Sequence, residues 1–228
     1  MISIQHLTVQ FSKKIILNDI SIDFTPNLIH GIVGLNGAGK TTFFNSLSTN
    51  LKADNGKLTF NEKPINYTAV AYLETNNFFY SRLTGNEYLN IFKQTNLDFN
   101  LESLQEFMQL PLDELVESYS TGMKKKLALL GVLKQKRPIF LLDEPFNGLD
   151  LETNKILELI ITTLKTKEKT VFLSSHIIDP LLTVCDEIHF LEQGKFTKKF
   201  EKNEFHRIED ELFRKLKTEA QNKISNSI

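Results

Sequence analysis

Short apolar runs alternate with polar clusters over the first part of the chain, at residues 2–9, 15–24 and 28–33. Runs of this length that are rich in Ile, Leu and Phe predict β-strands. At Gly34 the pattern changes to a glycine-rich turn, and residues 40–51 then repeat their apolar positions at helical spacing. The opening of the chain is therefore predicted to run strand, loop, helix.

The middle of the chain lacks strand alternation and predicts helices at residues 87–93, 101–110 and 123–133, with breaks at Pro111 and Gly122. Beyond them, apolar runs alternate with helical segments, the runs being residues 139–142, 170–173 and 188–191. Strands that alternate with helices are typical of parallel βαβ units. The sequence therefore predicts an α/β fold with a helical insertion at about 85–135.

A charged tail begins at Glu201, yet its apolar residues recur at helical spacing: Phe205, Ile208, Leu212 and Leu216. Such spacing predicts an amphipathic helix. The 228 residues suffice for one sizeable core with a small appendage. We therefore expect a main domain over 1–200 and a C-terminal amphipathic helical tail over 201–228.

Charge and cysteine usage exclude several classes. The net charge of −1, from 27 basic and 28 acidic side chains, gives no field that would attract nucleic acid, so no nucleic-acid partner is expected. The N-terminus lacks the features of a signal peptide, and no apolar stretch approaches the length of about 18 residues that a membrane span requires. We expect a cytoplasmic location, with the single cysteine, Cys185, as a buried thiol.

Residues 34–41, Gly-Leu-Asn-Gly-Ala-Gly-Lys-Thr, match the phosphate-loop pattern G-x-x-x-x-G-K-[ST] between a predicted strand and a predicted helix. The glycines let backbone N–H groups point at phosphate oxygens, and the helix start adds partial positive charge. A glycine-rich turn that binds nothing is the alternative, and the context disfavours it. The predicted nucleotide-binding residues are Asn36, Gly37, Ala38, Gly39, Lys40, Thr41 and Thr42, with Lys40 on the β- and γ-phosphates and Thr41 on Mg²⁺.

A second candidate site lies where the apolar run at 139–142 ends in Asp143 and Glu144. Open α/β sheets bind ligands at the carboxyl ends of their strands. We predict that Asp143 holds Mg²⁺ and that Glu144 polarises the attacking water as a general base. A solvated acidic pair before Pro145 is the alternative.

Tyr119-Ser120-Thr121-Gly122-Met123-Lys124 stands between these two motifs and resembles the signature of the ABC (ATP-binding cassette) ATPases. Asn147-Gly148-Leu149-Asp150 resembles the D-loop of that family, and His176 its switch histidine. The similarity covers residues 2–195. It implies a P-loop NTPase fold of ABC type, with a mostly parallel sheet core, an N-terminal antiparallel β subdomain and a helical insertion.

The resemblance also implies roles for single residues. Ser120 and Gly122 would bind the γ-phosphate held by an opposing subunit, His176 would contact the γ-phosphate, and Phe11 would stack on adenine, although Phe11 could instead be a core aromatic. The sequence departs from the family pattern at Thr121 and Met123. It also lacks the Q-loop glutamine, whose position falls on Thr75 beside Glu74.

The function implied is an ATP-hydrolysing subunit that requires ATP and Mg²⁺. It would form a homo- or heterodimer and serve a separate transmembrane permease from the cytoplasmic face. The form of the signature and Arg82-Leu83-Thr84-Gly85 are similar to bacterial multidrug and polymer exporter ATPases, which favours export. Two alternatives stay open: a soluble ABC-type ATPase without a transport partner, and an ATP-binding regulatory subunit without turnover.

Overall fold

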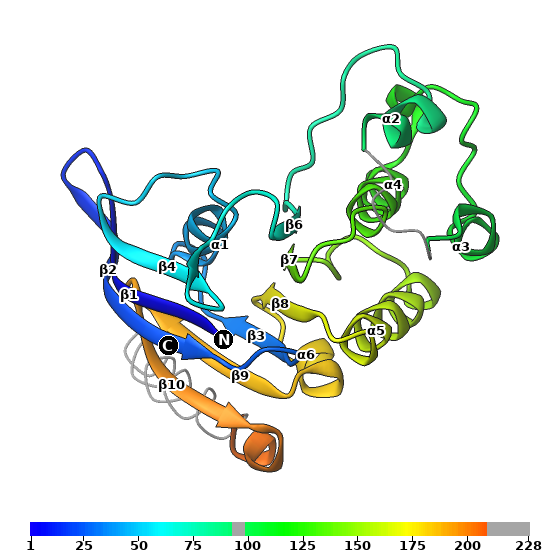
Figure 1. Ribbon diagram of the computed structural model, residues 1–228. Helices are drawn as coiled ribbons and strands as arrows, with labels where there is room; N and C mark the ends of the chain where they lie inside the picture. The colour runs from blue at the N-terminus through cyan, green and yellow to red at the C-terminus, as the bar shows by residue number, and fades with distance from the viewer. Residues whose placement is uncertain (93–98, 209–228) are drawn as a thin grey trace, which may run out of the picture.

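The strands of the computed structural model, which describes residues 1–92 and 99–208, form two sheets (Figure 1). The first is antiparallel in the order β2-β1-β4-β5: β1 Ile2–Phe11, β2 Lys14–Phe24, β4 Asn55–Phe60 and β5 Lys63–Pro64. The second has the order β10-β9-β3-β8-β7-β6: β3 Ile29–Val33, β6 Val70–Leu73, β7 Ile139–Asp143, β8 Thr170–Ser175, β9 Glu187–Glu192 and β10 Lys195–Glu201. All neighbours in the second sheet are parallel except β10, which pairs antiparallel with β9. The predicted α/β fold is confirmed.

The helices of the described residues are α1 Lys40–Leu47, α2 Gly85–Ile91, α3 Leu101–Met108, α4 Thr121–Leu133, α5 Leu151–Thr166 and α6 Asp179–Val184, with 3₁₀ turns at Val116–Ser118 and Lys202–Arg207. In Figure 1, α1 lies beside the antiparallel sheet, whereas α2, α3 and α4 form a separate layer on the other side of β6 and β7. No helix in the described part of the chain is both long and apolar enough to cross a membrane.

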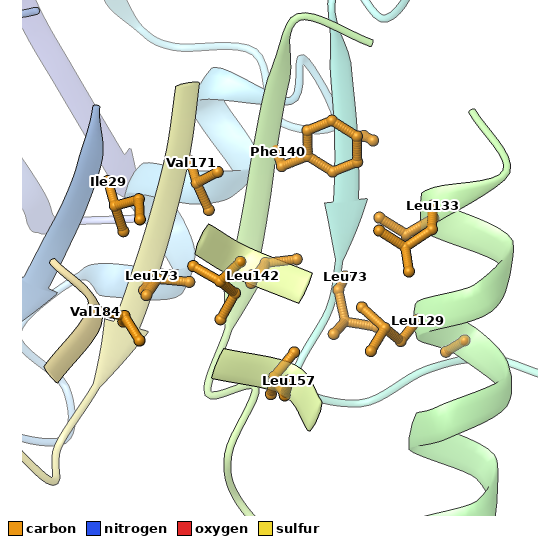
Figure 2. Packing of buried hydrophobic residues seen from close by; sticks show 14 of the residues in the cluster. Ile29, Leu73, Leu129, Leu133, Phe140, Leu142, Leu157, Val171, Leu173 and Val184 are labelled. Atoms are coloured by element: carbon orange, nitrogen blue, oxygen red, sulfur yellow. The ribbon is translucent and has the colours of Figure 1, made fainter. Parts of the chain in front are cut away.

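Two hydrophobic cores lie on the two faces of the second sheet, because side chains alternate along its strands. On β7, Phe140 and Leu142 join the core beneath the helices, whereas Ile139 and Leu141 face the antiparallel sheet. Figure 2 shows the first core, where Leu129 of α4 points toward Leu73 of β6. The strands that end at the site are thus fixed from both sides.

Several element boundaries differ from the prediction. Helix α1 ends at Leu47 rather than residue 51, because Ser48 caps it and Thr49 takes a left-handed φ of 66°. Gly122, expected as a break, lies within the first turn of α4, whose N-cap is Ser120. Helix α3 ends at Met108, where Gln109 has a φ of 50° ahead of Pro111.

The predicted tail helix is only partly within the described residues. Lys202–Arg207 is a 3₁₀ turn that follows β10, and it buries Phe205. Ile208 is also buried, whereas Leu212 and Leu216 lie outside the described residues. Cys185 is fully buried as expected, and burial raises the pKa of its thiol well above the usual range.

Candidate functional site

The site forms where three neighbouring parallel strands, β3, β8 and β7, end at one edge of the sheet. The segment after β3 supplies Lys40, the end of β7 supplies Asp143 and Glu144, and the segment after β8 supplies His176. Parallel pairing aligns the carboxyl ends of these strands, so residues more than a hundred positions apart become neighbours.

The phosphate loop takes the backbone form that its glycines permit. Gly37 and Gly39 have φ values of 83° and 109°, in the region that side chains disfavour. A Cβ on Gly39 would also lie 2.9 Å from Leu17 Cδ2. Gly39 is the N-cap of α1 and provides no side-chain hydrogen bond, so the first turn keeps N–H groups for an anion.

The other predicted residues of the loop differ in how exposed they are. Asn36 and Gly37 are exposed at its tip, Ala38 is buried, and Thr42 is half-buried in the first turn of α1. Lys40 is buried, and its ammonium group donates to the carbonyls of Gly34 at 2.7 Å and Leu35 at 3.5 Å. This cation therefore lies at the loop, where phosphate oxygens could replace the carbonyls.

Two side chains with hard oxygen ligands face each other beside the loop. The Thr41 hydroxyl donates to Asp143 Oδ2 at 2.7 Å, and the Ser174 hydroxyl donates to Asp143 Oδ1. Asp143 is fully buried. Hydroxyl and carboxylate oxygens are the donors that Mg²⁺ prefers, so the pair Thr41 and Asp143 fits such an ion.

Glu144 is held by contacts on several of its atoms. Its backbone φ is 50°, an uncommon value for a residue other than glycine. Its N–H donates to Ser174 Oγ at 2.9 Å, and its carboxylate lies 2.9 Å from His176 Nδ1 and 3.8 Å from Lys40 Nζ. The structure thus brings together Lys40, Glu144 and His176, as the sequence predicted.

From the sequence alone, the charge run Lys124-Lys125-Lys126 predicts a solvated helix face. The structure corrects this prediction for Lys125. Lys125 is buried, and its ammonium group donates to the carbonyl of Glu144 at 2.6 Å and of Asn147 at 2.8 Å. Burial lowers the pKa of Lys125, and this effect is opposed by nearby Glu144 and Asp143. The burial of Lys125 could not be predicted from the charge run, because only the fold shows which of the three lysines points inward.

Replacing Lys125 by Met is expected to destabilise the protein by about 1–3 kcal/mol, since it leaves the buried Glu144 carbonyl without a donor. ATP turnover should fall more than ATP affinity, because Glu144 loses one of its fixed contacts. Thermal unfolding and calorimetric ATP titration measure both effects. Lys124→Met on the same turn is the matched control, and equal losses of stability in the two variants would contradict the assignment.

The predicted signature residues lie on a different part of the surface. The exposed Ser120 caps α4 by accepting a hydrogen bond from the N–H of Met123 at 3.2 Å. Gly122 lies beside Gly148, since a Cβ there would be 3.2 Å from the Gly148 carbonyl oxygen. Figure 1 draws α1 and α4 well apart, on opposite sides of β6 and β7. The structure therefore does not bring Ser120 and Gly122 to the chain's own phosphate loop.

Phe11 is half exposed at the end of β1, so it is not a core aromatic. It pairs with Lys14 at the turn of the β1–β2 hairpin, and β2 then brings Leu17 against Gly39. An exposed aromatic ring on the strand that pairs with β2 suits base stacking. In the Q-loop region Glu74 accepts a hydrogen bond from the side chain of Asn50 at 3.3 Å, and Thr75 is exposed.

Ser174 is a second site residue for which the motifs predicted no role. Its register partner in the sheet is Asp143, and its one hydroxyl joins Asp143 to the backbone of Glu144. The pairing of two polar strand ends was the available signal, but it depends on knowing that β7 and β8 are neighbours.

Comparison with known proteins agrees with this geometry. The ABC transporter family model matches residues 17–147, more than half of the chain. The ABC transporter ATP-binding protein YtrB of Bacillus subtilis is 27% identical over 206 residues, which cover 86% of this chain and 70% of YtrB.

Two solved structures have the same fold. The ATP-binding subunit of an ABC transporter superposes with a TM-score of 0.85 at 23% identity, over 95% of this chain and 99% of that one. The dimeric ATP-binding cassette MJ0796, in a post-hydrolysis state with ADP and Pi, superposes with a TM-score of 0.78 at 18% identity, over 89% and 99%. Together with the phosphate loop, these matches show that the chain belongs to the ABC transporter family as an ATP-binding subunit, an ATPase cassette.

Proposed function

We propose that this ATPase drives export through a separate transmembrane permease, with ATP closing two ATPase subunits face to face and hydrolysis reopening them. The observation that supports it most is the cluster at the ends of β3, β7 and β8. There Glu144 lies 2.9 Å from His176 and 3.8 Å from Lys40, beside the Thr41–Asp143 pair. Phosphoryl transfer requires such positioning and charge neutralisation more than covalent chemistry.

Each group in the cluster has a proposed role. Lys40 neutralises charge on the β- and γ-phosphates, and Glu144 accepts the proton of the attacking water as a general base. His176 orients that water and contacts the γ-phosphate. Thr41 and Asp143 hold Mg²⁺, which when bound neutralises charge on the phosphate oxygens. Phe11 stacks on the adenine ring.

The dimer is proposed from the position of the signature segment. Ser120 and Gly122 stand at the start of α4, where helix N–H groups attract anions, whereas Lys40 begins α1, and Figure 1 draws these two helices well apart. In a two-fold dimer, each α4 start can face the phosphate loop of the other subunit. ATP would then contact both subunits, which explains how its binding could close the dimer.

The permease is proposed to dock at the loop between β6 and α2. A hollow of about 240 Å³ lies there, lined by Asn77, Phe79, Tyr80, Ser81, Val116, Glu117 and Lys124. Phe78 and Tyr80 are exposed at 73% and 59%, and their rings contact each other edge to face at a centroid distance of 5.1 Å. Exposed aromatics are typical interface anchors. Phe79, by contrast, packs inward on Tyr88.

The exporter assignment rests on the resemblance of the signature and of Arg82-Leu83-Thr84-Gly85 to exporter ATPases. In the structure Arg82 is exposed, and its N–H donates to Glu117 at the same hollow. A permease helix docked there would place the ATPase peripherally on the cytoplasmic face of the membrane.

Replacing Tyr80 and Arg82 together by Ala is expected to weaken permease binding about tenfold or more, because two interface anchors are lost. ATP binding should be unchanged, since the phosphate loop is on another part of the chain. Co-purification with the membrane protein encoded beside this chain measures the effect. Tyr67→Ala, at another exposed tyrosine that does not line the hollow, is the control.

Two outcomes would contradict the transport proposal. One is a wild-type chain that never associates with membranes although the neighbouring membrane protein is expressed, which would favour a soluble ATPase. The other is equal co-purification of wild type and the Tyr80 and Arg82 double variant, which would place the docking surface elsewhere.

A further inference from the structure

A cluster of three potential metal ligands lies at the centre of the second sheet, separate from the proposed Mg²⁺ site. His30 of β3 stands opposite Glu187 of β9 in the parallel register, and His189 follows two residues later on the same face. His30 and His189 are 0% and 1% exposed. One ligand atom from each of the three residues lies within 4.8 Å of the others.

The tautomer of His30 leaves a lone pair directed at a carboxylate. His30 Nε2 lies 2.8 Å from the carbonyl oxygen of Thr25, which can only accept, so Nε2 carries the hydrogen. In the neutral ring Nδ1 is then unprotonated, yet it lies 3.2 Å from Glu187 Oε2. Two lone pairs at this distance repel each other unless a cation lies between them.

His189 also has ring nitrogens without a hydrogen-bond partner. Its Nε2 lies 3.4 Å from Glu187 Oε2, and neither of its ring nitrogens nor His30 Nδ1 makes a hydrogen bond. Buried polar atoms without a partner lose their hydrogen bonds to water and gain none in return, so a native structure normally satisfies them. Two of these atoms, His30 Nδ1 and His189 Nε2, lie within 3.4 Å of the same carboxylate oxygen, which points to a missing ligand between them.

We propose that His30 Nδ1, His189 Nε2 and Glu187 Oε2 bind a divalent transition metal ion, with Zn²⁺ the best match. Bonds of about 2.0–2.1 Å in a tetrahedral site place two ligand atoms roughly 3.3 Å apart. Glu187 Oε2 lies at similar distances from its two partners, 3.2 Å from His30 Nδ1 and 3.4 Å from His189 Nε2. Two imidazoles favour Zn²⁺ over Mg²⁺ or Ca²⁺, which prefer oxygen ligands alone.

The surroundings resemble those of a structural metal. The Thr25 carbonyl accepts from the far nitrogen of His30, as is usual for a metal-binding histidine. Lys199 lies 2.6 Å from Oε1, the other oxygen of Glu187, and so leaves Oε2 for the ion. The rings of Phe24 and Phe172 pack on the imidazole of His30, with centroid distances of 5.2 and 5.0 Å, and leave His30 without exposed surface. The ion would join β3 to β9 and stabilise the sheet below the phosphate loop.

The proposal is tested on the full chain without nucleotide, after treatment with a chelator and in excess Mg²⁺. Calorimetric titration with Zn²⁺ is expected to show one tight site. Thermal unfolding is expected to show a higher melting temperature when Zn²⁺ is present. Glu187→Gln and His189→Asn should each weaken Zn²⁺ binding about 100-fold or more. His6→Ala removes an exposed histidine beside Asp19 and should leave the site intact.

Equal Zn²⁺ affinity in wild type, Glu187→Gln and His189→Asn would overturn the site. X-ray absorption of the Zn²⁺-loaded wild type provides a measurement that does not depend on how well the variants fold. Two imidazoles and an oxygen ligand at about 2.0–2.1 Å are expected. A wild type that binds no Zn²⁺ would also overturn the site.

Discussion

Glu144→Gln is expected to lower ATP turnover by about 10²- to 10⁴-fold while ATP binding remains. The amide keeps the size of the carboxylate but cannot accept a proton from water. It can also still hydrogen bond to His176, which lies 2.9 Å from the carboxylate, so the local structure should persist. Phosphate release measures turnover, and calorimetry measures ATP affinity.

The same variant should also accumulate as a dimer when ATP and Mg²⁺ are present, because closure no longer ends in hydrolysis. Size-exclusion chromatography with and without ATP detects this. Glu152→Gln, at an exposed acid in the first turn of α5, is the matched control and should behave as wild type. Hydrolysis near the wild-type rate in Glu144→Gln would remove Glu144 from its proposed role.

Ser120→Arg is expected to lower turnover by about 10²-fold or more, although Ser120 caps α4, which Figure 1 draws well apart from α1 and the phosphate loop before it. A bulky cation at the start of α4 would obstruct the partner's phosphate and oppose the helix dipole. ATP binding to the monomer should be spared. Calorimetry on dilute protein checks that binding, and phosphate release at several protein concentrations checks turnover.

Loss of the helix cap alone is a competing cause that Ser120→Ala separates. It removes the bond to the Met123 N–H, worth about 1 kcal/mol, without filling the space. It should therefore lose far less activity than Ser120→Arg. Similar activities in the two variants would point to helix stability rather than obstruction.

The site was predictable where its chemistry depends on adjacent residues. Lys40 and Thr41 follow a glycine pattern that only a few backbone forms satisfy, and Asp143 and Glu144 end an apolar run. The contact of Lys125 with Glu144 was not predictable. Three lysines follow one another there, and only the packing of α4 against the segment after β7 determines which of them is buried. The His30, Glu187 and His189 cluster depends on the pairing of β3 with β9, which no local pattern indicates.

The fold, too, was predictable where local patterns are strong and not where an element depends on its neighbours. The strands and helices with strong periodicity were predicted within a few residues, whereas β4, β5, β6 and β10 were not predicted as strands. Strand β10 was missed because Lys195–Glu201 is mostly charged and pairs on one side only. Its partner β9 shows why it forms, since the two strands are joined by a short turn with Gly194 at a φ of 75°. Such hairpin edges depend on a neighbour more than on their own composition.

The central claim, an ATP site shared between two subunits, is tested most directly by mixing two inactive variants. Lys40→Ala removes the cation of the phosphate loop, and Ser120→Arg blocks the signature. In a mixed dimer both changes fall in one shared site and the other site is intact. With equal amounts and random pairing, about a quarter of the wild-type turnover should return. A mixture no more active than either variant alone, in which chromatography confirms mixed dimers, would contradict the shared site.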